Sequence, residues 1–222
     1  MPKLRPDTHK ARREHILDAA ERCFARDGFQ GTTMKDICRE AGVSLGALYV
    51  YFASKEGLIA GITERDRSKL AAQLAEVATA PDLLAALARL GEHYTVEEPR
   101  YKQQLVIEIG CTSMRSASVG EIFRSCDQQV MAQFEALFAR AAAEGKIAPA
   151  LDAKTLAQTI AVLGDGLFWR RAVDPNFDAK TMVPIITRLI GGLLNPSPAV
   201  APYASQAPTT LAPTTAHDEV KT

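Results

Sequence analysis

Apolar residues recur at helical spacing along most of the chain, and this pattern predicts an all-α protein. A first helix is expected over residues 10–27, where one apolar face carries Ile16, Ala19, Ala20, Cys23 and Phe24. Later helices are expected over residues 54–78, 82–93, 105–114, 119–144, 152–173 and 178–194. Pro184 either kinks the last of these helices or marks its true start, because proline lacks the amide that a helix interior needs.

Residues 32–42 predict a short helix with a signal at each end. Its apolar stripe is formed by Met34, Ile37, Cys38 and Ala41. Thr32 or Thr33 is placed to cap the N-terminus, because a hydroxyl can accept one of the unpaired amides of the first turn. Gly42 can take the positive φ that ends the helix and reverses the chain.

Ser44 is expected to cap a second short helix, whose inward side chains are Leu48 and Phe52. Two helices joined by a short turn that contains glycine form the helix-turn-helix pattern. Packed against the first helix of the chain, they would enclose a core of Ile16, Phe24, Ile37, Val43, Leu48 and Phe52. So small a core is marginal, and the helix that begins at Ser54 is needed to support it.

The run AGVSLGALYVYFASKEGL makes this pattern specific. It resembles the DNA-binding signature of the TetR family of bacterial transcriptional regulators, closely over residues 28–58 and loosely over the rest. The resemblance implies a three-helix DNA-binding head (residues 1–55) and a helical body (residues 56–194) that binds a ligand and dimerises. Residues 195–222 are rich in Pro, Ala, Ser and Thr and are expected to be a disordered tail.

The DNA-binding residues expected from this resemblance are Thr33, Lys35, Ser44, Leu45, Gly46, Ala47, Tyr49, Val50, Tyr51 and Lys55. Thr33, Ser44 and Lys55 lie at or beside helix starts, where free amides and the helix dipole favour phosphate. In the family, the positions that match Tyr49 and Tyr51 also reach the DNA backbone, although Tyr49 could instead be a core residue.

The base-facing positions depart from the common family pattern. Family members often carry Lys, Thr, Asn or His where this chain has Leu45, Ala47 and Val50. These side chains have no donors or acceptors, so they cannot form bidentate bonds with guanine or adenine. The means of sequence recognition that remain are contact with thymine methyl groups, the Gly46 amide and indirect readout of DNA shape. Recognition is expected on an inverted-repeat operator of double-stranded DNA.

The distribution of charge favours a nucleic-acid partner, although the formal net charge is +0. One acidic residue, Asp7, accompanies five basic residues at the N-terminus: Lys3, Arg5, Lys10, Arg12 and Arg13. A basic arm beside a helix-turn-helix is typical of phosphate binding.

Composition also limits the location and the chemistry of the protein. No apolar run is long enough to span a membrane, and the N-terminus lacks the apolar segment of a secretory signal, so a cytoplasmic location is expected. Cys23, Cys38, Cys111 and Cys126 lack metal-ligand spacing, and no metal, cofactor or disulfide is expected. Glycine-rich phosphate loops, HExxH and GxSxG are absent from the sequence, which argues against an enzyme.

The resemblance implies a small-molecule effector whose binding to the body releases the DNA. Candidate lining residues are Tyr94, Tyr101, Glu108, Met114, Phe123, Met131, Phe134, Phe168 and Trp169. Such residues are more often plain core. Glu108 would select cations if it faced a cavity, but it could also face solvent or pair with an arginine. A lipophilic effector and control of an efflux system are expected; the alternative is a helical adaptor or ligand-binding protein without specific DNA binding.

The last two predicted helices carry more apolar surface than one small domain easily buries, and they are the expected homodimer interface. Their apolar residues are Leu156, Ile160, Leu163, Leu167, Ile185, Ile186, Leu189, Ile190, Leu193 and Leu194. Each of Gly164, Gly166, Gly191 and Gly192 costs a helix about 1 kcal/mol, which close approach of another helix would explain. An intramolecular core is the alternative.

Overall fold

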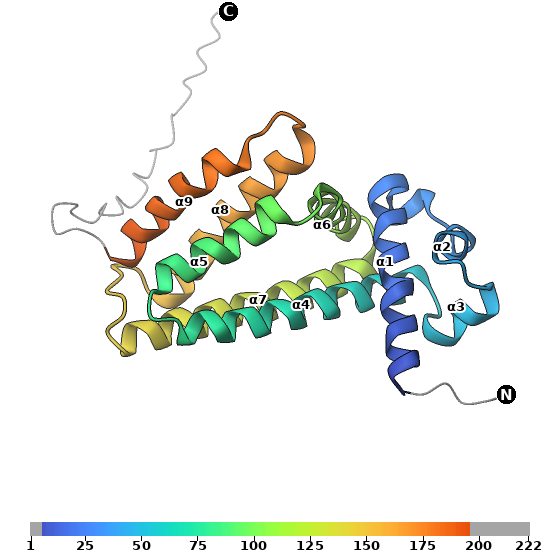
Figure 1. Cartoon of the computed structure of the whole chain (residues 1–222), viewed down its shortest axis with the longest axis horizontal. Coiled ribbons are helices and arrows are strands. Elements are labelled where there is room, and N and C mark those ends of the chain that lie inside the picture. The colour runs from blue at the N-terminus through green and yellow to red at the C-terminus, as the bar shows by residue number, and fades with distance from the viewer. Residues whose placement is uncertain (1–5, 196–222) are drawn as a thin grey trace, which may run out of the picture.

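The computed structural model describes residues 6–195, which form nine α-helices and one short π-helix, η1 (His93–Glu97) (Figure 1). The α-helices are α1 (Pro6–Gly31), α2 (Met34–Ala41), α3 (Leu45–Tyr51), α4 (Lys55–Thr79), α5 (Leu83–Glu92), α6 (Arg100–Ser113), α7 (Ala117–Ala143), α8 (Ala153–Val173) and α9 (Ala179–Leu194). The predicted all-α class is confirmed. None of the helices in this range is long and apolar enough to cross a membrane.

The predicted disordered tail and the predicted basic arm lie at the two ends of the chain. The tail after Asn195 and the basic residues Lys3 and Arg5 lie outside the described residues. Lys10, Arg12 and Arg13, the basic residues of the arm that the structure describes, lie in the first turns of α1.

Most helices begin and end close to the predicted positions, with two informative exceptions. α6 begins at Arg100, directly after Pro99, whereas the apolar pattern predicts a start at Leu105. The first turn of α6 is polar, so it contributes nothing to an apolar stripe. Pro184 lies inside α9, which begins at Ala179, so Pro184 does not mark the start of the last helix.

Figure 1 shows the head at one end of an elongated molecule. The long helices α4 and α7 pack along each other and connect the head to the far end, where α5, α8 and α9 gather. α6 packs against α1 on one side and against α7 and α8 on the other. This helix therefore touches both the DNA-binding head and the body.

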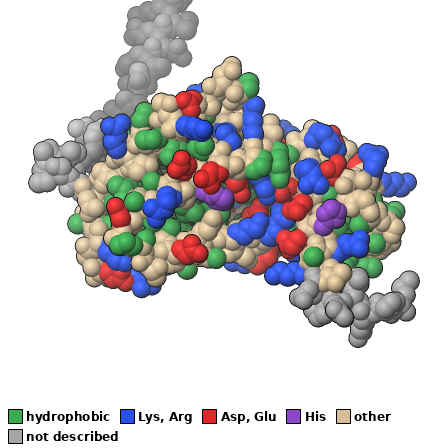
Figure 2. Space-filling view, in the orientation of Figure 1, with side chains coloured by type: hydrophobic (Ala, Val, Ile, Leu, Met, Phe, Trp, Pro, Cys, Tyr) green, Lys and Arg blue, Asp and Glu red, His purple; other side chains and the backbone are tan. Residues whose placement is uncertain are grey.

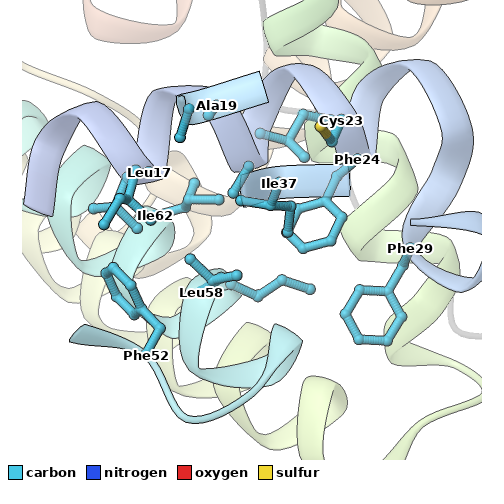
Figure 3. Close-up of a cluster of buried hydrophobic side chains, with 14 of the residues drawn as sticks. Leu17, Ala19, Cys23, Phe24, Phe29, Ile37, Phe52, Leu58 and Ile62 are labelled. Carbon is cyan, nitrogen blue, oxygen red and sulfur yellow. The ribbon is translucent and has the colours of Figure 1, made fainter. Parts of the chain in front are cut away.

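The core of the head is built from the apolar faces that the sequence predicts (Figure 3). Among the predicted core residues, Val43 is partly buried, and five are buried: Ile16, Phe24, Ile37, Leu48 and Phe52. The same cluster continues into Leu58 and Ile62 of α4 and Leu105 of α6. The hydrophobic packing is thus continuous across residue 55, where the sequence analysis divides head from body.

A second buried cluster holds the far end of the body together. It joins the C-terminal parts of α4 and α7 with α5, α8 and α9. Leu156, Leu167 and Leu194 are buried within the single chain, as the intramolecular alternative expects. Gly191 lies against α5, because a Cβ built on it would be 2.9 Å from Cδ2 of Leu84. The close approach at Gly191 is therefore made within one chain.

Candidate nucleic-acid interface

Two neighbouring threonines hold the start of the helix-turn-helix. Thr33 is the N-cap of α2: its hydroxyl accepts from the Asp36 amide at 3.2 Å, and its own amide donates to Oδ2 of Asp36 at 2.9 Å. Hydrogen bonds from Thr33 lower the pKa of Asp36. Thr32 is buried, and its hydroxyl donates to the Gly28 carbonyl at 2.8 Å. Thr33 is thus the cap, and Thr32 fastens α2 to the end of α1.

The turn and the second helix follow the predicted chemistry. Gly42 ends α2 with a φ of 61°, in the left-handed region that glycine tolerates best. The Ser44 hydroxyl accepts from the Ala47 amide at 3.2 Å and so caps α3. Leu48 and Phe52 anchor α3 to the core, and this orientation turns its opposite face to solvent.

The predicted base-reading face of α3 is exposed. Leu45 is 36% exposed, Tyr49 50% and Val50 73%. Gly46 has open space where a Cβ would stand, so none of residues 6–195 covers that position. Ala47 is partly buried, since it lies nearer to the packed side of the helix. The side chains proposed to touch bases are therefore available to a partner.

The two tyrosines of α3 differ in their surroundings. Tyr49 is half exposed, so the core alternative for this residue is wrong in the structure. Tyr51 is partly buried and packs on the head core, with its ring centroid 4.5 Å from that of His9 on α1. Lys35 and Thr33 are exposed at the start of α2. Thr33, Lys35 and Tyr49 thus have exposed side chains, whereas Tyr51 is accessible only in part.

Lys55 occupies a different position from the one that the sequence suggests. Its ammonium donates to the carbonyls of Phe29 at 2.5 Å and Thr32 at 2.8 Å, and it lies 4.5 Å from the centroid of the Phe29 ring. The side chain is therefore engaged inside the head. The backbone amide of Lys55, at the first position of α4, is the group left for phosphate.

A buried ion cluster between head and body is absent from the sequence predictions. The fully buried carboxylate of Glu21 on α1 lies 2.6 Å from Nζ of Lys102 on α6 and also contacts Arg65 on α4. Burial raises the pKa of Glu21, and the charges of Lys102 and Arg65 oppose that rise. Acidic and basic side chains also mingle on the surface where head meets body (Figure 2). The only local signal is an acidic residue among the apolar positions of α1, because the partners lie far along the chain.

Two family models match this chain. The model described as "Bacterial regulatory proteins, tetR family" matches residues 16–62, and the model described as "BetI-type transcriptional repressor, C-terminal" matches residues 103–195. The chain belongs to the TetR family. The predicted resemblance is confirmed, and the protein is a DNA-binding transcriptional regulator of the helix-turn-helix type.

Named relatives agree with this assignment. The HTH-type transcriptional regulator UidR of Escherichia coli (strain K12) is 26% identical over 186 residues, which cover 83% of this chain and 94% of UidR. The HTH-type transcriptional repressor AcnR of Corynebacterium diphtheriae is 34% identical over 76 residues, which cover 34% of this chain and 40% of AcnR. The structure of Salmonella enterica GusR matches with a TM-score of 0.70 and 29% identity, over 83% of this chain and 95% of GusR.

The candidate effector-binding residues of this TetR-family protein lie in several different places. Phe123 packs against the head core, whereas Phe134 packs against the far cluster and stacks on Phe138. Tyr101 and Phe168 are partly buried. Met114 and Trp169 are 76% and 53% exposed, so neither lines an enclosed cavity of the single chain.

Two surface hollows lie elsewhere on the body. One, of about 640 Å³, lies between the end of α7 and the start of α8 and is lined by residues such as Phe138, Ile147 and Leu151. The other, of about 280 Å³, lies between α7 and α8 and includes Met131. Met131 is the one predicted effector residue that these two hollows contain. Glu108 faces neither of them; its carboxylate bonds to the backbone of the head.

Proposed function

We propose that this protein is a cytoplasmic, homodimeric repressor that binds an inverted-repeat operator and is released from it by a small lipophilic molecule. The observation that carries the proposal is the exposed face of α3, where Leu45, Tyr49 and Val50 stand clear of a fully packed head. The match of residues 103–195 to a repressor-type C-terminal model supports repression over activation.

Phosphate contacts and base contacts have separate sources in this proposal. Thr33, Lys35, Ser44, Tyr49, Tyr51 and the amide of Lys55 hold the sugar-phosphate backbone. Leu45, Gly46, Ala47 and Val50 face the base edges of the major groove. Because these four positions offer no polar side chains, thymine methyl groups are the features that they can read.

The homodimer is proposed to form through α8 and α9, as a bundle of four helices. On α8, Val162, Trp169 and Val173 are exposed along one stripe, and Gly166 on the same stripe has open space above it. On α9, Ile185 and Leu189 are exposed one turn apart. A second copy of the chain would bury both stripes and bring two heads to one side of the duplex.

The effector is proposed to be lipophilic because the candidate residues inside the body are mainly aromatic, including Phe123, Phe134 and Phe168. Such a molecule releases the operator only if it binds more tightly to a conformation with a different separation of the heads.

Selection of random DNA by the purified full-length protein, followed by sequencing, tests the proposal. The expected product is an inverted repeat with thymines at the steps that face α3. Replacing one such thymine by uracil removes one methyl group and should weaken binding about four-fold, from about 0.8 kcal/mol per buried carbon. Recovery of no enriched sequence would favour the helical adaptor, and equal affinity for the uracil operator would exclude readout of methyl groups.

A further inference from the structure

One residue near the C-terminal end of α1 is held on both sides by charged side chains. Phe29 follows Gly28, whose φ of 73° turns the end of α1 toward α2. The Phe29 amide donates to Oε1 of Glu108 on α6 at 2.6 Å, and the Phe29 carbonyl accepts from Nζ of Lys55 on α4 at 2.5 Å. Phe29 is only 3% exposed, so neither backbone group has water as a ready alternative.

The close approach of Glu108 depends on the glycine before Phe29. A Cβ built on Gly28 would lie 3.3 Å from Oε1 of Glu108. That is a tight contact, and the positive φ at Gly28 is itself unfavourable for other residues. A single glycine therefore provides both the bend and the room for the carboxylate.

The carboxylate of Glu108 takes part in two hydrogen bonds here. Besides the Phe29 amide, the hydroxyl of Thr112 lies 3.4 Å from the same carboxylate oxygen. The carboxylate accepts from the backbone of the head, so the condition under which Glu108 would select cations, that it faces a cavity, does not describe its position. A hydrogen bond to an ionised acceptor is about twice as strong as a neutral one.

α6 is attached to α1 at a second charged point. Lys102 on α6 meets the buried carboxylate of Glu21, with Nζ 2.6 Å from Oε1. Lys102 and Glu108 are six residues apart, about 9 Å along the helix axis. Two anchors at that separation define both the position and the direction of α6 relative to α1. On its other side α6 packs on α7 and α8.

We infer that Glu108 is a positioning residue for DNA binding, which sets the angle of the helix-turn-helix by holding Phe29. The segment that it holds leads directly into Thr33, the N-cap of α2. A hydrogen bond of 2.6 Å is lost beyond about 3.5 Å, so a movement of α6 by about 1 Å frees a buried amide. Any ligand that moves α6 thereby changes the orientation of the head. The inference rests on the proposed function.

Three full-length variants test this role. Glu108→Ala removes the acceptor, whereas Glu108→Gln keeps the shape and a neutral acceptor oxygen. Glu121→Ala makes the same truncation at an exposed position on α7 and serves as the matched control. Two properties are measured: hydrogen exchange at the Phe29 amide without DNA, and affinity for the selected operator relative to nonspecific DNA.

For Glu108→Ala, exchange at Phe29 should be at least about ten-fold faster, and preference for the operator about ten-fold weaker. Glu108→Gln should lie between this variant and the wild type, and Glu121→Ala should match the wild type. Such rescue by glutamine separates positioning from a general loss of stability, which a melting curve checks. If Glu108→Ala is folded and both properties are unchanged, the inference is overturned. If Glu108→Ala does not fold, unchanged exchange and operator preference in Glu108→Gln overturn it.

The exchange measurement needs no operator. Failure of the wild type to select any DNA would overturn the proposed function while leaving the exchange result in place. If exchange at the Phe29 amide and operator binding are both unchanged in Glu108→Ala, only the role of Glu108 is overturned.

Discussion

The head and the body of this protein complete their cores to different degrees. In the head, Ile16 and Leu48 are 0% exposed, and the large apolar side chains left exposed among its described residues all belong to α3. In the body, Val162 is 70% and Leu189 54% exposed, although both lie on long helices. Exposed apolar side chains that share one stripe of a helix, as Val162, Trp169 and Val173 do on α8, usually mark an interaction surface.

The difference shows which parts of the molecule a single chain can finish. The short helices α2 and α3 gain little stability by themselves, so they depend on caps and a dense core. α8 and α9 are long enough to form with one apolar face uncovered. The core of the DNA-binding head is therefore complete within one chain, whereas the body leaves apolar surface that a second chain can bury.

The largest expected effect comes from charging the uncovered surface of the body. Val162→Glu with Leu189→Glu should convert the dimer into monomers, and operator affinity should fall at least about 100-fold because two linked heads bind far more tightly than one. Light scattering and operator titration measure the two effects. Val106→Glu changes another exposed valine, 47% exposed on α6, and should leave the dimer intact. A double variant that remains dimeric would show that α8 and α9 do not form the interface.

The next largest effect concerns the ion cluster that joins the two regions. Lys102→Met leaves the buried carboxylate of Glu21 with Arg65 as its remaining cation, and the free energy of unfolding should fall by about 2 kcal/mol. Adding Glu21→Gln should recover much of that loss, because the buried carboxylate is then replaced by a neutral amide while Arg65 keeps Asp18 at 2.8 Å. Denaturant unfolding measures both. Lys69→Met, at a side chain that is 62% exposed, is the control with little expected change.

A smaller effect is expected from the exposed tyrosine of the head. Tyr49→Phe removes one hydroxyl and should weaken operator binding by about 1 kcal/mol, or about five-fold, if that hydroxyl bonds to phosphate. Because Tyr49 is 50% exposed, the free energy of unfolding should stay the same. Tyr101→Phe in the body should leave operator affinity unchanged. Equal affinity of Tyr49→Phe and wild type would remove Tyr49 from the phosphate contacts.

The smallest effect is a pH dependence within the helix cap. Hydrogen bonds from Thr33 lower the folded-state pKa of Asp36, so its stabilising contribution is present above the unfolded pKa of about 3.9. That contribution disappears as the pH falls through the lower folded pKa. The difference in melting temperature between wild type and Asp36→Asn should therefore be largest near pH 7 and shrink in acid. Glu76→Gln on α4 should show no such trend, and a pH-independent difference for Asp36→Asn would contradict this account.

Local chemistry determined the all-α class, the helix-turn-helix and its caps. The pairs Thr33–Asp36 and Ser44–Ala47 are close in the chain, and apolar spacing identifies the faces that meet. The resemblance to the TetR family also depends on such local motifs.

Only the tertiary structure decided what the charged residues do. From the sequence, Lys55 is assigned to DNA phosphate and Glu108 to an effector site. In the structure both side chains bond to the backbone of Phe29, and Glu108 is 79 residues from Phe29 in the chain. Glu21 finds Lys102 across 81 residues. Sequence spacing of 3 or 4 residues specifies a helix face, but contacts over such separations depend on how whole helices pack. The exposed stripes on α8 and α9 have the same apolar spacing as the buried core faces. Only the packing of the whole helices therefore separates exposed from buried residues.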